Sequence, residues 1–120
     1  MANPNISASG YIYGKVQGIA LSTSASTLLG SVPASHVYKV NSLLVSNING
    51  TAAADVTVTL YDSSAATTYY IAYTISVPND STLALISKDT GIYLEESDYI
   101  QIYASASSYL HAIISYEDIY

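Results

Sequence analysis

The sequence contains no cysteine, so neither disulfide bonds nor thiolate metal ligands contribute to its structure. It also lacks arginine, phenylalanine and tryptophan, and its only basic residues are Lys15, Lys39 and Lys88. Because neutralisation of phosphates dominates affinity for nucleic acids, three scattered lysines argue against nucleic-acid binding. The same scarcity argues against anionic membranes, and no apolar run reaches the roughly 18 residues of a membrane helix. We therefore expect neither nucleic acid nor membrane among the partners.

Sequence signatures of catalysis are missing as well. His36 and His111 lie far apart in the chain, and neither belongs to a recognisable motif. No G-x-S-x-G elbow, HExxH pair, glycine-rich phosphate loop or zinc spacing occurs. We expect His111 to face outward or into a contact and His36 to be structural. The chain is therefore predicted not to be an enzyme and to have no catalytic residues and no cofactor.

Paired carboxylates perform glycosidase chemistry when they face each other across a cleft. Glu95, Glu96 and Asp98 share one predicted turn, which does not provide that geometry. Calcium is a second interpretation, since loops at Asp80, Asp89 and this turn supply the hard oxygen ligands it prefers. The spacing of a calcium-binding loop is absent, so a solvated turn is favoured and no metal is expected.

Half of the residues are apolar, only 10% are charged, and the net charge is -6. High apolar content with low charge argues against disorder, and 120 residues suit one domain. All aromatic residues are the 13 tyrosines. A tyrosine ring packs while its hydroxyl remains at a wet boundary, so these residues suit half-buried strand faces, subunit interfaces or sugar-binding surfaces.

Apolar residues mostly alternate with polar ones, which predicts β-strands separated by turns about every ten residues. A short strand is expected at 11–13, and further strands at 26–32, 36–46, 55–62, 68–77, 83–86, 92–94, 98–105 and 109–117. Without crossover helices these strands pair mainly antiparallel. The predicted fold is an all-β antiparallel sandwich, jelly-roll-like or Ig-like, with an N-terminal arm.

The last two predicted strands form a hairpin in this interpretation. Its inward set is Ile100, Ile102, Ala104, Leu110, Ala112, Ile114 and Tyr116. A one-residue slip would turn one half of this set outward, which constrains the register. The opposite face would then hold Tyr99, Gln101, Tyr103, Tyr109 and His111, and we predict Tyr99, Tyr103, Tyr109 and His111 as interface residues.

Residues 1–24 are rich in Ser, Ala and Gly and are separated here from the sandwich domain at 25–120. Tyr11, Ile12 and Tyr13 are nevertheless more apolar than a solvated tail requires. The segment is either the first strand of the subunit's own sheet or an arm that adds a strand to a neighbouring subunit. In the second case Tyr11 and Tyr13 belong to the interface.

The C-terminal part of the chain carries a resemblance. Residues 92–105 read Ile-Tyr-Leu-Glu-Glu-Ser-Asp-Tyr-Ile-Gln-Ile-Tyr-Ala-Ser, and residues 110–119 read Leu-His-Ala-Ile-Ile-Ser-Tyr-Glu-Asp-Ile. This resembles small virion proteins of tailed bacteriophages, where a Leu-x-x-Gly-Asp turn leads into Ile-x-Val-x-Ala-Ser and a final Ser-Tyr-x-Glu-Ile strand. Ser97 stands where that pattern has Gly. With Val32-Pro33-Ala34 and the strands at 37–47 and 56–61, the resemblance covers about residues 26–119.

The resemblance implies a β-sandwich building block of the virion that assembles as a homo-oligomer, a trimer being the favoured state. Its partners would be other virion proteins, such as the major capsid protein or tail components. The leading hypothesis is a capsid decoration or cement subunit, and a neck, tail or fibre component is the alternative within the particle. A carbohydrate-binding or adhesin module is a second class, against which the absence of Trp counts. A hydrolase is a third class, which the missing motifs disfavour.

Overall fold

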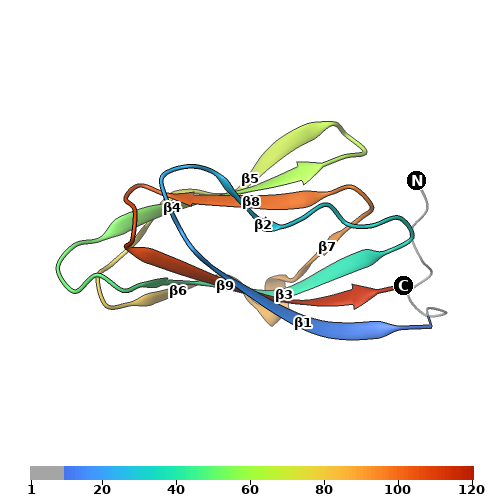
Figure 1. Ribbon diagram of the computed structural model, residues 1–120, viewed down its shortest axis with the longest axis horizontal. Helices are drawn as coiled ribbons and strands as arrows, with labels where there is room; N and C mark the ends of the chain where they lie inside the picture. Colours follow the sequence, from blue (N-terminus) through green and yellow to red (C-terminus); the bar gives the residue numbers. More distant parts are fainter. Residues whose placement is uncertain (1–9) are drawn as a thin grey trace.

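The computed structural model describes residues 10–120, which form two antiparallel β-sheets packed face to face (Figure 1). Sheet A has the order β1-β9-β3-β6, with β7 also paired to β3, and sheet B has the order β2-β8-β4-β5. The strands are β1 (Ile12–Ala20), β2 (Ser26–Leu29), β3 (Val37–Asn47), β4 (Ala54–Asp62), β5 (Thr67–Val77), β6 (Thr82–Ile86), β7 (Ile92–Leu94), β8 (Tyr99–Ala104) and β9 (Leu110–Ile119). Within residues 10–120 the one helical element is the single turn η2 (Lys88–Thr90), so no helix there can cross a membrane.

The strand order is that of a jelly roll, in which the chain passes repeatedly from one sheet to the other. β6 and β7 lie one after the other along the same side of β3, so together they fill one strand position of this topology. The predicted antiparallel β-sandwich is confirmed. Of the two predicted topologies, jelly-roll-like and Ig-like, the strand order is the jelly roll. The expected strands at 26–117 are all present, with boundaries that differ by up to three residues.

The core lies between the two sheets and is built from alternate residues of each strand. Because successive side chains of a strand point to opposite faces, one face of each sheet is apolar and the other faces outward. Both central pairs of strands contribute fully buried side chains, among them Val40, Leu43, Val45, Val56, Val58, Ile100, Ile102, Leu110, Ala112 and Ile114. The complete inward set predicted for the two C-terminal strands is buried.

The predicted C-terminal hairpin is wrong, however. β8 pairs with β2 and β4 in sheet B, whereas β9 pairs with β1 and β3 in sheet A. The segment between them crosses from one sheet to the other, so the two strands face each other across the core. Alternation specifies which side chains point inward, and it does so equally well for hydrogen-bonded neighbours and for strands in opposing sheets. The outward residues of β8 and β9 therefore lie on opposite faces of the sandwich.

β5 also departs from simple alternation. Its pairing with β4 shifts register twice, between Val58 and Thr59 and between Val56 and Val58, so one extra residue is inserted at each place. At the second bulge Thr74 has a φ of 49°, and its N–H donates to the Thr57 hydroxyl at 3.1 Å. The extra residues reverse the side-chain alternation. Tyr73 therefore does not share a face with Ile75, although residues two apart in a regular strand do.

Residues 12–20 form β1, which pairs with β9 of the same chain from Ile12↔Ile119 to Ala20↔His111 without a register shift. The strand is much longer than the expected cluster at 11–13, because Gly14, Gly18 and the exposed positions between them weaken the apolar signal. Residues 1–9, which the arm hypothesis also included, lie outside the described residues. Residues 12–20 therefore form a strand of the subunit's own sheet.

Replacing Ile102 with Ala is expected to lower the free energy of unfolding by about 2–5 kcal/mol, because the fully buried side chain leaves a cavity between the sheets. Urea denaturation of the purified chain measures this loss. Replacing Tyr103, which points outward on the same strand, with Ser is expected to cost less in the isolated subunit. Equal losses for the two variants would contradict the assignment of faces.

Replacing Ser97 with Gly is expected to stabilise the protein by about 1 kcal/mol, because Ser97 has a φ of 71° in the turn before β8. In this left-handed region glycine carries no steric penalty, which accounts for the Gly of the phage pattern at this position. Ser107, an exposed turn residue outside that region, is the control. Ser107→Gly is expected to destabilise slightly, and a Ser97→Gly variant that behaves likewise would refute the strain argument.

Candidate interaction surfaces

The predicted interface residues do not form one surface. Tyr99 and Tyr103 are on the outer face of sheet B, whereas His111 is exposed on the outer face of sheet A, beside a shallow hollow next to β1. Tyr109 precedes β9 and packs partly buried against the core. The predicted single face is therefore divided in two, for the same reason that the hairpin is absent.

The outer face of sheet B holds five tyrosines, here called the tyrosine face: Tyr61, Tyr70, Tyr73, Tyr99 and Tyr103. Tyr61 and Tyr99 are directly opposite on β4 and β8, and their rings stack at 4.8 Å with an interplanar angle of 17°. Tyr70 and Tyr73 meet edge to face at 4.9 Å, and about 60% of each is exposed. Of these five, the sequence pattern predicts only Tyr99 and Tyr103 as interface residues, because strand order and the β5 bulges decide which tyrosines join them.

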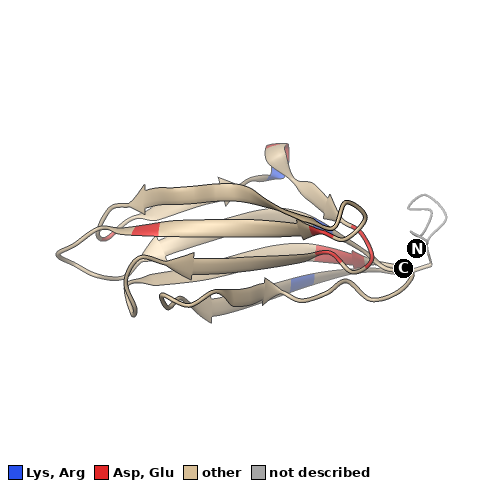
Figure 2. Cartoon of the chain, turned by 90° about the horizontal axis from the view of Figure 1, so that it is seen from above, with Lys and Arg blue, Asp and Glu red and all other residues tan. Residues whose placement is uncertain are grey.

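Between these rings the face carries hydroxyl and amide groups from Thr27, Thr59, Thr68 and Gln101, which the strand registers place in rows across the sheet. Acidic residues lie at its margins, with Asp55 near the start and Asp62 at the end of β4. Figure 2 views this face from above, and the middle of sheet B shows neither acidic nor basic residues. The tyrosine face is thus an uncharged surface of flat rings and neutral hydrogen-bonding groups.

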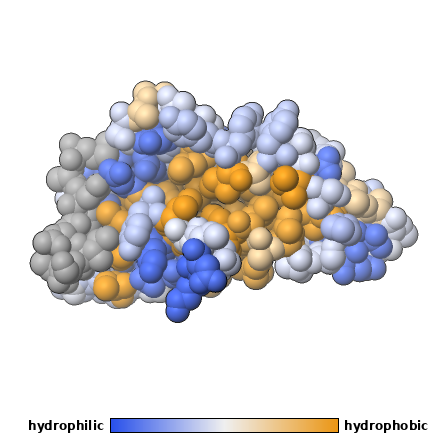
Figure 3. Space-filling view, turned by 180° about the vertical axis from the view of Figure 1, so that it is seen from behind, coloured by the Kyte–Doolittle hydropathy of each residue, from blue (hydrophilic) through white to orange (hydrophobic). Residues whose placement is uncertain are grey.

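A second surface, here called the apolar edge, lies where β5 of sheet B approaches β6 and β7 of sheet A. Ile71, Leu83, Leu85 and Ile92 are only partly buried there, and Ile75 is 42% exposed. Figure 3 views the molecule from this side and shows hydrophobic residues across its middle. Contiguous exposed apolar surface is a common mark of protein contacts.

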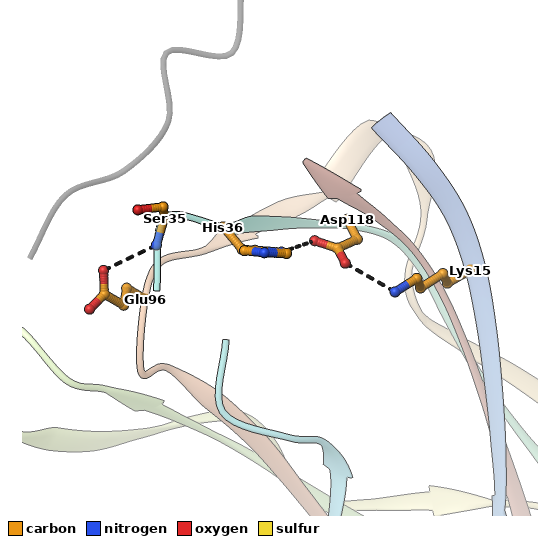
Figure 4. A network of polar contacts seen from close by, with 5 residues as sticks. All are labelled: Lys15, Ser35, His36, Glu96 and Asp118. Carbon is orange, nitrogen blue, oxygen red and sulfur yellow. Dashed lines mark hydrogen bonds and ion pairs between the residues drawn. The ribbon is translucent and has the colours of Figure 1, made fainter. Parts of the chain in front are cut away.

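The third feature is a polar network at one end of the sandwich (Figure 4). The Asp118 carboxylate on β9 is almost fully buried and accepts from Lys15 Nζ on β1 at 3.0 Å. Its other oxygen lies 2.7 Å from His36 Nδ1, just before β3. Nearby, the Ser35 backbone N–H donates to Glu96 at 3.4 Å. The lysine and the histidine give a buried carboxylate the partners that it requires inside a protein.

Aromatic rings cover this network. Tyr11, Tyr13 and Tyr120 have ring centroids 5.3–6.0 Å apart, and the His36 ring stacks on Tyr120 at 4.1 Å. Loss of hydration raises the pKa of Tyr120, with a further contribution from Tyr13. Tyr11 and Tyr13 thus lie in one cluster with two residues that sequence reasoning had not connected to them. Tyr120 and His36 are far from Tyr11 and Tyr13 in the sequence, and no sequence pattern indicates that the four rings lie together.

The acidic turn before β8 is solvated at Glu95 and partly at Glu96, as the sequence predicts, but not at Asp98. Asp98 is buried, and its carboxylate accepts from the Ser63 N–H at 2.9 Å and the Glu95 N–H at 2.9 Å. It also accepts from the Ser63 hydroxyl at 3.1 Å. Asp98 therefore ties the β4–β5 turn to the start of β8. Across residues 10–120, no three His, Asp or Glu side chains gather closely enough to hold a metal ion.

The polar network around Asp118 predicts how the free energy of unfolding depends on pH. Its hydrogen bond to Asp118 raises the pKa of Lys15 above the usual 10.5, and burial raises the pKa of Tyr38 above the usual 10.0. A raised folded-state pKa stabilises the protein fully below the unfolded-state value, and this stabilisation is lost as pH rises through the folded-state value. The free energy of unfolding is therefore expected to fall above about pH 10.

Urea denaturation at a series of alkaline pH values measures this fall. Lys15→Met is expected to show a shallower fall than the wild type, because the contribution of Lys15 is removed and those of Tyr38 and Tyr120 remain. Lys39→Met on β3 serves as the control, since it changes the net charge equally and leaves the pair with Asp118 intact. A fall of the same steepness in all three proteins would contradict the assignment.

No protein-family model and no curated protein matches the chain. Among solved structures, it is similar to Bacillus endospore appendages, which form a novel family of disulfide-linked pili, with a TM-score of 0.56, 15% identity, and coverage of 91% of this chain and 86% of that chain. It is also similar to a pentameric capsid protein from metagenomic phage sequences, with a TM-score of 0.42 and 16% identity over 87% of this chain. It spans 62% of that capsid protein. At 15% identity, the similarity to the appendages is one of fold.

Proposed function

We propose that this protein is a structural subunit of a tailed-bacteriophage particle that decorates or cements the capsid. It acts by burying surface at subunit contacts and catalyses no reaction. The observation that carries the proposal is the tyrosine face, an uncharged aromatic surface covering one side of the sandwich. Interface cores are depleted in charge and enriched in tyrosine, so this composition suits a lasting protein contact.

Two further features support the proposal. The apolar edge offers a second contact surface on a different side of the molecule, as a subunit within a lattice of neighbours requires. The resemblance of residues 26–119 to small virion proteins is the reason for proposing a phage particle as the assembly. The corresponding location is the virion, and the partners are other copies of the chain together with the major capsid protein or tail components. The same resemblance favours a trimer.

A position in the neck, tail or fibre is the alternative within the particle. Carbohydrate binding is a separate candidate, for which the stacked pair Tyr61–Tyr99 is the specific observation. Aromatic rings present flat apolar faces to sugars, and the neighbouring Thr and Gln side chains supply hydrogen bonds. The two candidates differ in ligand, so binding to capsids and binding to a glycan array separate them.

Imaging of intact particles with antibody against the chain tests the location directly. Labelling over the capsid surface supports decoration, whereas labelling at the neck, tail or fibres selects the alternative. Absence of the chain from every purified particle, together with binding to glycans, would replace the virion role with carbohydrate binding.

Replacing Tyr103 with Ser is expected to weaken binding to capsids on the order of 10-fold or more, because truncating a tyrosine that acts as a hot spot at the centre of a contact costs about 2 kcal/mol or more. Co-sedimentation of the purified subunit with capsids lacking it measures the affinity. Tyr93→Ser is the matched control, since Tyr93 is 51% exposed on β7, on the outer face of the other sheet. Equal affinities for Tyr103→Ser and the wild type would reject the tyrosine face as the contact.

A further inference from the structure

Among residues 10–120, β1 is an edge strand whose outer side offers a row of main-chain groups without a hydrogen-bonded strand beside them. Tyr11 and Tyr120 exchange both backbone hydrogen bonds, at 2.9 and 3.0 Å, and Leu21 N–H donates to Leu110 at 2.9 Å. Hydrogen-bonded pairs alternate along an antiparallel ladder, so the odd-numbered residues of β1 bond to β9. The even-numbered residues direct their N–H and C=O groups away from the sheet: Ile12, Gly14, Val16, Gly18 and Ala20.

The other edges of the sandwich are protected against strand addition. β2 has four residues and a register shift, and Gln17 Nε2 already donates to its Leu28 carbonyl at 2.9 Å. β5 is bulged twice, and the edge made by β6 and β7 is interrupted by η2 with its charged residues. Short strands, bulges and charges are the usual protection of sheet edges. β1 has nine residues, no proline and no register shift.

The one charge on β1 does not protect it either. Lys15 points toward the inner side of sheet A, where its ammonium group pairs with Asp118 at 3.0 Å. On the outer side Ile12 and Val16 are 57% and 70% exposed. The edge thus combines a regular backbone with apolar side chains and a neutralised lysine, although the whole chain carries a charge of -6. Two copies meet here without bringing unpaired charges together.

We propose that β1 pairs antiparallel with β1 of a second copy of this chain, in a register centred on Val16, so that the two A sheets become one continuous sheet. The register places Val16 opposite Val16 of the second copy, Gly14 opposite Gly18, and Ile12 opposite Ala20. On the inner side, Tyr13 lies opposite Ile19 and Lys15 opposite Gln17. A shift to a centre at Lys15 would set two ammonium groups opposite each other, which is unfavourable.

A two-fold contact of this kind closes after two copies. Where another surface makes a trimer, the β1 contact joins one oligomer to the next. The proposal extends the subunit contacts of the proposed function to a named strand, but it concerns association of the purified chain with itself. Capsid binding is measured separately, so failure of one leaves the other standing.

Cysteine cross-linking tests the register, because the natural chain has no cysteine. In the proposed pair the two residues 16 lie about 5.5 Å apart between Cα atoms, within disulfide range. Val16→Cys is therefore expected to form disulfide-linked dimers under mild oxidation on the order of 10-fold faster than Gly18→Cys. Two cysteines at position 18 would be displaced by about 13 Å along the strand direction in the same register, from the rise per residue of a strand.

Gly18→Cys is a matched control, since it lies on the same face of the same strand and an added Cβ meets only ordinary contacts. Mixing Gly14→Cys with Gly18→Cys is expected to restore cross-linking, because these positions oppose each other between copies. Val16→Cys cross-linking no faster than Gly18→Cys, with no gain on mixing, would overturn the proposal.

Sedimentation gives a second readout without cysteines. Val16→Pro removes an outward N–H from each copy and spares the bonds to β9, and proline is tolerated at such edge positions. Loss of the two reciprocal hydrogen bonds is expected to weaken association on the order of 10- to 100-fold. The mass of the sedimenting species at a fixed protein concentration then falls by half, whereas the Val16→Thr variant is expected to keep the mass of the wild type. A folded Val16→Pro with unchanged mass would also overturn the proposal, and the cross-linking result decides if that variant does not fold.

Discussion

Burial of alternate side chains between two sheets is the constraint from which the rest of this structure follows. Each strand has one apolar face, and a single sheet cannot remove that face from water. Fully buried residues such as Leu43 and Ile114 of sheet A belong to the same core cluster as Val58 and Ile102 of sheet B. Within residues 10–120, buried side-chain nitrogen and oxygen atoms all have hydrogen-bond partners. Asn47, for example, donates to the carbonyls of Ala52 and Val77, at 3.0 and 2.9 Å.

The same constraint gives the two outer faces their character. With only 10% charged residues, the chain lacks enough ionic side chains to cover the outward positions of nine strands. Tyr, Thr, Ser and Gln occupy them instead, and sheet B collects Tyr61, Tyr70, Tyr73, Tyr99 and Tyr103. A surface of neutral rings and hydroxyls is weakly repelled by copies of itself and by other proteins. The proposed structural role depends on that property.

The edges of the sheets divide into protected and open ones by ordinary local means. Bulges distort β5, a turn of helix interrupts the edge after β6, and β2 is short and contacted by Gln17. Of the edge strands in the described part of the chain, β1 is the one that combines regular pairing with nine uninterrupted residues. Its inward lysine is paired with Asp118, so the charge that would discourage a neighbour is already satisfied. These differences between the edges are the basis for proposing β1 as the strand through which two copies associate.

The sequence by itself determined the class of the fold and the inward side of most strands, because a period of two is a local property of the backbone. It also identified the turn at Ser97, where the phage pattern has Gly and the backbone adopts a φ of 71°. Residues 12–20 were mostly missed, since their glycines and exposed positions carry no apolar alternation. Tertiary structure alone decided that β8 and β9 lie in different sheets, which separates Tyr99 and Tyr103 from His111. It also decided that Tyr120 and His36 meet Tyr11 and Tyr13 around Asp118. Strand pairing joins residues distant in sequence through backbone hydrogen bonds that are the same for every residue type, so the side-chain pattern specifies faces and leaves partners to the packing of the whole domain.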